Sequence, residues 1–428
     1  YINLLKISLS KNIEVEKMTE AWIIDACRTP RGIGKAGKGA LSSMHPQHLG
    51  AAVLKAIAER NKINTAEVDD IIWGTSSQRG TQGGDLGRMA ALDAGYDVKS
   101  SAVTLDRFCG SGITSVNIAA SSVMSGMEDL VLAGGTEMMS TYGQDGNTPS
   151  PFMDNGNTRL RSEHPQPHQG VCADAIATLE GIDREAVDAL AFVSQQNADK
   201  AIKGGHFDKS LIPVYNAEGE LVLDKEEFPR PQTTLEGLAE LKASFESLAD
   251  YPLDEQGSTF RKLVLQKYPD LKINHVHHAG NSSGVVDGAA ALLLASPNYA
   301  KANGMKPRAR IKAMANMGDS PTLMLNAPVP AAKKVLEKAN LTIDDIDLFE
   351  VNEAFSVVTE KFIRDLNIDR DKINVNGGAM ALGHPIGATG SILVGTVLDE
   401  LERRDLQFGL VTMCAAGGMA PAVIIERV

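Results

Sequence analysis

The two ends of this chain carry the same succession of sequence patterns, and this repeat constrains the fold more than any other feature. Residues 66–78 (AEVDDIIWGTSSQ) and 342–354 (TIDDIDLFEVNEA) each combine an acidic helix end with a buried strand. The segments TLDRFCGSGITSVNIAAS and VNGGAMALGHPIGATGSILVGT each predict a strand, a glycine-rich turn and a small-residue helix. The segments MEDLVLAGGTEM and LQFGLVTMCAAGGMAPAVIIE each predict an apolar strand that ends in a glycine-rich loop. The paired segments lie a similar distance apart, roughly 275–280 residues, which indicates a duplicated fold rather than a solenoid of short repeats.

Within each repeat, apolar strands alternate with amphipathic helices. This alternation predicts mostly parallel sheets that are covered by helices on both faces. Between residues 142 and 271 the chain becomes polar and turn-rich, with a helical pattern over residues 183–204. A long insertion inside a regular α/β fold is usually functional, so we expect a loop domain over 142–271 that covers a substrate. The two α/β/α halves are then residues 18–141 with 272–300, and residues 301–428.

The first residues, 1–17, differ from the rest of the chain. A natural-looking start, MTEAWIIDACRTP, follows at Met18. The segment lacks Arg and carries Glu14 and Glu16, which is atypical of an organelle transit peptide, and its apolar part is too interrupted for a secretory signal. We treat residues 1–17 as an extension of unknown origin.

Overall composition narrows the partners and the compartment. The chain has 428 residues and a net charge of −12, so a general attraction to nucleic acid is not expected. No apolar stretch is long enough to span a bilayer. Four cysteines are few and scattered, which favours a reducing compartment. We expect a cytoplasmic protein of bacterial type, with an organelle matrix as the alternative.

Cys109 lies in the stretch RFCGSG, where a strand over 102–105 turns into a small-residue helix. Amide groups and the dipole at a helix N-terminus stabilise a thiolate, which predicts a lowered pKa for the Cys109 thiol. The same amides can hold an oxyanion. The alternative is a small residue packed in a tight turn.

His384 and Cys414 lie in two further glycine-rich loops. Glycines on both sides of His384 let backbone or a ligand approach closely, and Pro385 fixes the backbone after it. Its pKa suits a general base near neutral pH, although a lone histidine can also be structural. Cys414 ends a strand, in a loop that the repeat places opposite AGGTEM. Corresponding loops of two such halves meet at one crevice, so we expect Cys109, His384 and Cys414 to converge.

Six motifs in order carry a resemblance to a known family. They are CGSG at 109–112, GNSSG at 280–284, DGAA at 287–290, NEAF at 352–355, GGAMALGHPIGATG at 377–390 and CAAGGM at 414–419. From about residue 20 to its end the chain resembles the thiolases (acetyl-CoA C-acyltransferases). The resemblance implies a five-layered fold of two α/β/α halves with an inserted loop domain. It also implies reversible CoA-dependent cleavage of 3-ketoacyl-CoA to acetyl-CoA and a shortened acyl-CoA, or the reverse Claisen condensation, by way of an acyl-cysteine.

The resemblance further implies what this protein binds. Coenzyme A and acyl-CoA are substrates, and no separate cofactor and no metal is expected. The chain is expected to form a homodimer or homotetramer, and other β-oxidation enzymes are further candidate partners.

The catalytic roles also follow from the resemblance. Cys109 resembles the acyl-accepting nucleophile, with His384 as its base. Cys414 resembles the cysteine that removes the α-proton of acetyl-CoA in condensation and returns it in cleavage. Asn352 of NEAF resembles the residue that, with His384, positions a water in one oxyanion hole. Backbone N–H groups of Cys109 and Ala416 would form the second.

Three positions are implied to meet coenzyme A. Ser283 of GNSSG and Ala279 just before it resemble the loop at the pantetheine arm. His168 of HPQPHQG resembles a histidine beside the same arm.

Two residues near the nucleophile depart from the family's common pattern. Asp106 stands where Asn is common, and a carboxylate there would raise the pKa of Cys109 unless it is paired, with Arg107 as the candidate. Ala416 replaces a common glycine, so its N–H can serve as a donor only if its φ stays negative.

Three departures concern the substrate pocket. Gln169 stands where short-chain biosynthetic members have Met, Val286 replaces a usual polar residue, and residues 248–272 form an insertion before GNSSG. A polar amide at 169 and extra covering chain favour a longer or bulkier acyl group than that of acetoacetyl-CoA.

Other interpretations are weaker. His275, His277 and His278 suggest a metal site, but on a strand 275 and 277 share a face while 278 points away, and the sequence nearby offers no acidic or Cys ligand. A ketoacyl-synthase-type condensing enzyme is the rival activity, although such enzymes use one cysteine with two histidines. A catalytically idle scaffold of a β-oxidation complex is the rival from another class, and the presence of every catalytic residue type argues against it.

Overall fold

The computed structural model describes residues 20–144, 150 and 152–428, so the expected extension 1–17 lies outside the described residues. Ten of its strands form one sheet in the order β10-β11-β12-β9-β1-β8-β5-β3-β4, with β2 beside β8, and β6 and β7 form a separate two-stranded sheet. The first half contributes β1 (Trp22–Arg28), β2 (Gly32–Ile33), α1 (Pro46–Asn61), β3 (Asp70–Gly74), α2 (Leu86–Asp93), β4 (Val103–Leu105), α3 (Ser111–Ser125), β5 (Leu130–Met138), β8 (Val286–Ala295) and α10 (Pro297–Ala302). The second half contributes β9 (Ala309–Gly318), α11 (Pro328–Ala339), β10 (Leu348–Val351), α12 (Ser356–Leu366), α13 (Ala379–Leu382), α14 (Ile386–Arg404), β11 (Phe408–Thr412) and β12 (Met419–Arg427).

The remaining elements lie between β5 and β8 or are short connections. The inserted segment holds α4 (Thr158–Glu163), α5 (Gln169–Glu180), α6 (Arg184–Lys203), β6 (Val214–Tyr215), β7 (Leu221–Leu223), α7 (Leu235–Ala239), α8 (Glu246–Ala249) and α9 (Phe260–Leu265). Short 3₁₀ helices occur at η1 (Ala40–Ser43), η2 (Thr65–Glu67), η3 (Gly80–Gln82), η4 (Met139–Thr141), η5 (Ile343–Asp345) and η6 (Arg370–Lys372).

The strand pairing confirms the duplicated fold. β3 pairs in parallel with β5 just as β10 pairs with β11, and β5-β8-β1 in one half matches β11-β12-β9 in the other. Two acidic residues repeat as well: the Asp69 carboxylate accepts the N–H groups of Asp129 and Leu130, and the Asp347 carboxylate accepts those of Gln407 and Phe408. Each aspartate therefore holds the start of the next strand, which is a structural role.

The prediction of mostly parallel sheets is wrong, because only β10–β11, β3–β4 and β3–β5 pair in parallel and the other pairs of the large sheet are antiparallel. β8 is antiparallel to β5 and β1, and β12 is antiparallel to β11 and β9. The reason is the connection: β11 and β12 are joined by residues 413–418 alone, which is long enough for a hairpin but not for a crossover to a parallel strand. The two half-sheets meet where β1 and β9 share the pairs Trp22↔Arg310 and Ile23↔Ala309.

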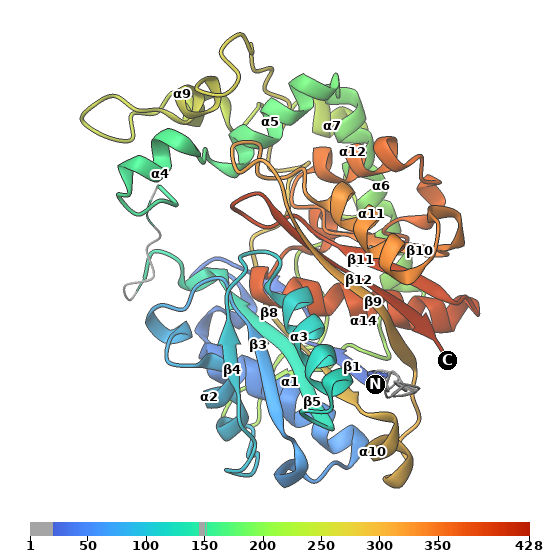
Figure 1. The fold of residues 1–428 in the computed structure, drawn as a ribbon. Coiled ribbons are helices and arrows are strands. Elements are labelled where there is room, and N and C mark those ends of the chain that lie inside the picture. Colours follow the sequence, from blue (N-terminus) through green and yellow to red (C-terminus); the bar gives the residue numbers. More distant parts are fainter. Residues whose placement is uncertain (1–19, 145–149, 151) are drawn as a thin grey trace, which may run out of the picture.

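The helices complete a five-layered arrangement, as expected from the resemblance (Figure 1). Helices α3 and α14 form the middle layer, in one apolar cluster with strands of both halves. Every residue of α14 from Gly387 to Leu401 is buried, which is typical of a helix enclosed on all sides. Helices α1 and α2 cover the outer face of the first half, and α11 and α12 cover that of the second.

The inserted segment lies above the strand ends, with α4, α5, α7 and α9 at the top of Figure 1. The helix expected over 183–204 is confirmed as α6, whose N-terminus is capped by the Asp183 carboxylate accepting the Ala186 N–H. The corresponding connection in the second half is only residues 413–418, so the insertion is peculiar to the first half. The exact domain boundaries stay a prediction.

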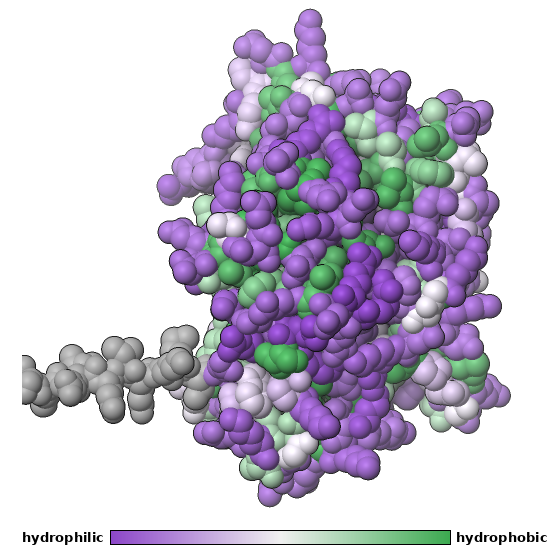
Figure 2. Space-filling view, turned by 90° about the vertical axis from the view of Figure 1, so that its right-hand side faces the viewer, coloured by the Kyte–Doolittle hydropathy of each residue, from purple (hydrophilic) through white to green (hydrophobic). Residues whose placement is uncertain are grey.

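The surface and the helix lengths agree with a compact layered protein. The face shown in Figure 2 is mostly polar, with apolar side chains visible in patches between polar ones. Across the described parts of the chain, no helix has the length and apolar character to cross a membrane.

Candidate active site

The structure brings the loops of Cys109, His384, Asn352 and Cys414 to one place. Helices α3 and α14 begin side by side, since the Ser391 hydroxyl near the start of α14 donates to the Gly112 carbonyl at 3.0 Å. Cys109 directly precedes α3, and His384 directly precedes α14. The Asn352 side chain lies 3.3 Å from the His384 ring (Nδ2 to Nε2).

Cys414 joins this group through the end of β11. The Asn352 N–H donates to the Thr412 carbonyl at 3.3 Å, which fixes the NEAF loop beside the Cys414 loop. Burial raises the pKa of the Cys414 thiol, and the proximity of Cys109 raises it further. The two thiols are therefore neighbours in a buried site, as the repeat predicts.

The hydrogen bonds of His384 fix its tautomer. Its Nδ1 lies 2.6 Å from the Thr389 hydroxyl, and that hydroxyl donates its own proton to the Pro385 carbonyl at 2.9 Å. The network therefore assigns the proton to Nδ1 and leaves Nε2 as an acceptor. Burial lowers the His384 pKa to about 3, so the ring is neutral at physiological pH. A neutral ring with an unprotonated Nε2 is the form that a general base requires.

The backbone before His384 depends on a glycine. Gly383 has φ of 94°, and a Cβ at this position would lie 2.4 Å from the Val286 side chain. Val286, the residue that departs from the usual polar type, is buried and packs at this point. The apolar side chain therefore supports the histidine loop.

The expected lowering of the Cys109 pKa is wrong. Burial raises the pKa of this thiol to about 12, the Glu137 and Asp106 carboxylates raise it as well, and only the residue's own N–H lowers it. Cys109 is 9% exposed, so the desolvation of a thiolate outweighs the helix-start amides. In the substrate-free site both Cys109 and His384 are neutral.

The expected pairing of Asp106 with Arg107 is also wrong. The Asp106 carboxylate accepts the Phe108 N–H at 2.6 Å, and Arg107 donates to the Asn316 side chain instead. Burial raises the Asp106 pKa, while Arg79 lowers it. Asp106 therefore raises the pKa of Cys109, as predicted for an unpaired carboxylate.

Two backbone N–H groups are placed to act as donors. Within the residues that the structure describes, no backbone carbonyl accepts the N–H groups of Cys109 and Ala416. Ala416 has a negative φ, and the positive φ angles of this turn are carried by Gly417 (80°) and Gly418 (78°). Alanine at 416 therefore preserves a backbone donor.

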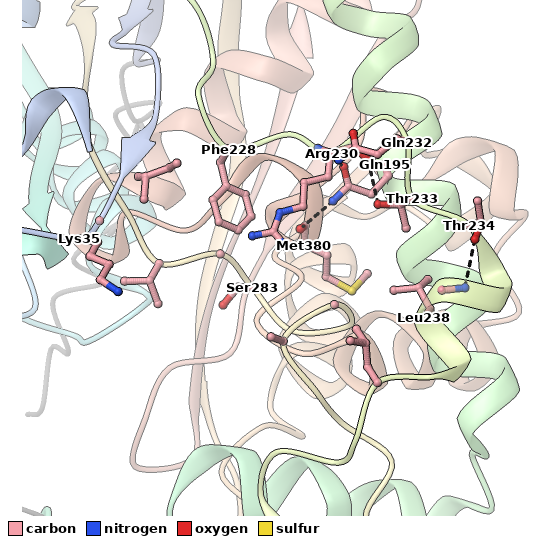
Figure 3. Close-up of a pocket in the computed structure, with 18 residues that line it drawn as sticks. Lys35, Gln195, Phe228, Arg230, Gln232, Thr233, Thr234, Leu238, Ser283 and Met380 are labelled. Atoms are coloured by element: carbon pink, nitrogen blue, oxygen red, sulfur yellow. Dashed lines mark hydrogen bonds between the residues drawn. The ribbon is translucent and has the colours of Figure 1, made fainter. Parts of the chain in front are cut away.

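A cavity of about 610 Å³ opens beside the GNSSG loop (Figure 3). Ser283 and Ala279, the loop residues expected to meet coenzyme A, line it. The Ser283 N–H donates to the Ala354 carbonyl at 3.0 Å, which ties this loop to NEAF. The loop beside the cavity is thus tied to the loop that carries Asn352, although Cys109, Asn352, His384 and Cys414 do not themselves line the cavity.

Two cations of the cavity were not singled out from the sequence. Lys35 comes from the first half, and Arg230 comes from the insertion, where its N–H donates to the Gln195 side chain at 2.9 Å (Figure 3). The FPRP sequence around Arg230 is a detectable signal, because flanking prolines hold an extended backbone. For Lys35 we find no such signal.

His168 does not line this cavity. Its ring packs between Phe245 (5.7 Å between ring centroids) and Phe260 (5.5 Å), and burial lowers its pKa. Phe260 belongs to the inserted residues 248–272, and it joins the apolar cluster that contains Cys414 and Phe355. The insertion therefore covers the side of the site where His168 lies.

Gln169 does not have the surroundings that we expected. It is exposed at the first turn of α5, so its amide stays hydrated. The predicted cost of burying an unpaired amide against a small acyl group does not arise in this structure.

The three histidines before GNSSG form hydrogen bonds with acidic residues. His275 and His277 share the Asp174 carboxylate at 2.6 and 2.8 Å, whereas His278 lies 2.8 Å from Asp188. The prediction that 275 and 277 share a face is confirmed. The absence of nearby acids was wrong, because α5 and α6 bring these carboxylates from elsewhere in the chain. Within the described ranges, no group of three or more His, Cys, Asp or Glu residues could hold a metal ion.

Comparisons with known proteins identify the family to which this architecture belongs. Residues 21–248 match the N-terminal domain of thiolase and residues 305–427 match its C-terminal domain. The chain is 38% identical over 418 residues to a steroid 3-ketoacyl-CoA thiolase of Mycobacterium tuberculosis, covering 96% of this chain and 95% of that protein. It is also 38% identical over 433 residues to a beta-ketoadipyl-CoA thiolase of Acinetobacter baylyi, covering 96% and 100%.

Solved structures agree with these matches. The human mitochondrial 3-ketoacyl-CoA thiolase superposes with a TM-score of 0.82 at 32% identity, covering 96% of this chain and 100% of that one. A Bacillus anthracis acetyl-CoA acetyltransferase superposes with a TM-score of 0.81 at 33% identity and the same coverage. Fold and matches together define a CoA-dependent acyltransferase. The chain belongs to the thiolase family, which answers the ketoacyl-synthase alternative.

Proposed function

We propose that this enzyme cleaves 3-ketoacyl-CoA thiolytically, and reversibly, through an acyl group carried by Cys109. One observation supports this most: the loops of the two buried thiols are hydrogen-bonded to those of His384 and Asn352, and the Thr389 hydrogen bond leaves the Nε2 of the neutral His384 unprotonated. The experiment that tests it is thiolysis of 3-ketoacyl-CoA by free coenzyme A with the purified full chain. No turnover with any such substrate would contradict the proposal.

The chemistry follows from the two neutral groups. As Cys109 sulfur attacks the 3-keto carbon, its proton passes to His384 Nε2, so neither charge exists before substrate arrives. The free N–H groups of Cys109 and Ala416, and Asn352 with His384, supply donors for the oxygens that gain charge. Breaking the C2–C3 bond leaves the acetyl-CoA carbanion, which takes a proton from Cys414. The thiol of a second coenzyme A then displaces the acyl group from Cys109: its proton goes to the Cys414 thiolate, and His384 returns its proton to the departing Cys109 sulfur.

We propose that coenzyme A binds in the cavity of about 610 Å³ beside GNSSG. Ser283 and Ala279 would meet the pantetheine arm, and the family resemblance assigns His168 to the same arm, although it does not line the cavity. Lys35 and Arg230 supply positive charge for the phosphates, although the whole chain is acidic at −12.

We expect a preference for medium or bulky 3-ketoacyl-CoA thioesters over acetoacetyl-CoA, with kcat/KM higher by roughly tenfold or more. The support is the insertion, which adds Phe260 to the apolar cluster of Cys414 and Phe355. The relatives named for steroid and beta-ketoadipyl substrates point in the same direction. Thiolysis across substrates of graded length and branching measures the preference.

Phe260→Ala should shrink that preference, whereas Gln266→Ala, an exposed position just past α9, should leave it unchanged. A clear preference of the unaltered enzyme for acetoacetyl-CoA would mean that the insertion does not shape the acyl pocket.

We also propose a homodimer or a dimer of dimers. β4 is the outermost strand of the first half, and its Val103 is 45% exposed. An apolar free edge is suited to pairing with a second copy across a two-fold axis. Sedimentation should show a dimer or larger species that Val103→Lys shifts towards monomer. Leu221→Lys, at a 52% exposed site on the separate β6–β7 sheet, is the control. A monomeric unaltered protein would contradict this.

All four cysteines are free, which supports a reducing compartment, the cytoplasm first and an organelle matrix second. Association with other β-oxidation enzymes stays a proposal on the family resemblance alone.

A further inference from the structure

Glu350 is a buried carboxyl group for which the mechanism above has no use. It lies on β10, two residues before Asn352, which follows directly after the strand. It is 2% exposed, and its Oε2 atom has no hydrogen-bond partner among the described residues. A buried polar atom without a partner is costly, so such an atom in a native site calls for an explanation.

The Asn352 side chain also has a buried polar atom without a hydrogen-bond partner. Its nitrogen faces His384 Nε2 at 3.3 Å, but its oxygen is buried and has no partner within the described chain. Glu350 and Asn352 both line a small enclosed void of about 10 Å³, which is close to the room that one water needs. Thr389, whose hydroxyl accepts the hydrogen bond from His384 Nδ1, lines the same void.

The orientation of this amide matters for His384. If the amide were turned by 180°, its oxygen would face the Nε2 lone pair, and two acceptors would oppose each other. Only a donor on the other side of the amide can hold the oxygen away from the ring. Thr389 and Thr396 also line the void, but their hydroxyls donate to the Pro385 and Ile392 carbonyls. Glu350, on the strand that ends just before Asn352, is such a donor when protonated.

The charge state of Glu350 agrees with this role. Burial raises its pKa well above the ordinary value, Glu353 and Glu400 raise it further, and Arg31 lowers it. Arg31 is already engaged by the buried Glu226 carboxylate at 2.8 Å. A neutral Glu350 carries an O–H group and can therefore serve as the donor that the Asn352 oxygen lacks.

We propose that Glu350 is a positioning residue for catalysis: as a neutral acid, acting through one water in the void, it holds the Asn352 amide with its nitrogen toward His384. The inference rests on the proposed roles of Asn352 and His384. It assigns Glu350 no contact with substrate and no proton transfer.

The test compares Glu350→Gln with Glu350→Leu in the full chain. Glutamine keeps a neutral donor of similar length, so kcat for thiolysis should stay within about threefold of the unaltered enzyme. Leucine removes the donor, so kcat should fall by about tenfold or more while KM for 3-ketoacyl-CoA is unchanged. The melting temperature of Glu350→Leu should be equal or higher, because an unsatisfied buried group is lost.

Thr359→Val is the matched control, since Thr359 is also buried with an unpartnered hydroxyl but does not line the void. It should leave kcat unchanged. Glu350→Met replaces the leucine variant if that one fails to fold. A folded leucine or methionine variant with full kcat would overturn the proposal, and so would a glutamine variant as impaired as leucine. Failure of the unaltered enzyme to turn over any 3-ketoacyl-CoA would instead contradict the proposed function.

Discussion

Cys109→Ala is expected to lower kcat for thiolysis by at least about a thousandfold, because no other group can carry the acyl chain between the two half-reactions. The loss should appear with every 3-ketoacyl-CoA tested, since the acyl-cysteine is common to all of them. Steady-state thiolysis with free coenzyme A is the measurement.

Cys27→Ala is the control for that experiment. Cys27 is also buried, but it belongs to the outer-layer cluster under α1, where its thiol donates to the Val53 carbonyl at 3.4 Å. This variant should keep most of the activity. Substantial turnover by Cys109→Ala would remove Cys109 from the nucleophile's role.

The second large effect distinguishes the step that needs Cys414 from the step that needs His384. If Cys414 moves only the α-proton, Cys414→Ala should still be acylated by acyl-CoA at Cys109, yet fail to turn over 3-ketoacyl-CoA. His384→Ala should slow acylation itself by roughly 10²–10⁴-fold, because the raised pKa of Cys109 leaves almost no thiolate without a base. Rapid-quench measurement of acylation in the two variants gives both numbers. Equal acylation rates would contradict this division of roles.

The repeat in the sequence predicted the architecture because its markers are local. Asp69 and Asp347 each precede an apolar strand in the same pattern, and both hold the start of a neighbouring strand through the same pair of hydrogen bonds. The glycine-rich turn of Cys109 marked where a strand gives way to a helix. The glycine-rich loop of His384 instead joins helices α13 and α14, and that of Cys414 joins the antiparallel strands β11 and β12.

What could not be predicted depends on contacts between distant parts of the chain. The rule that helix N-termini stabilise thiolates predicted a lowered pKa for Cys109. Burial raises this pKa instead, and the extent of burial depends on how the layers assemble. The His275 and His277 rings found Asp174 about a hundred residues away, a distance in the chain over which spacing carries no signal. The contact between Thr389 and His384 is more local, because Thr389 lies five residues after His384 and the first turn of α14 brings its hydroxyl to the ring.

The most direct test of the account is to trap the acyl-enzyme. The full chain is incubated briefly with acyl-CoA, quenched in acid and digested, and the peptides are mapped by mass spectrometry, with Cys109→Ala and Cys414→Ala in parallel. We predict the acyl mass on the peptide that contains Cys109, present in the unaltered enzyme and in Cys414→Ala, and absent from Cys109→Ala. An adduct on Cys414 in the unaltered enzyme would contradict the account and reverse the roles of the two cysteines.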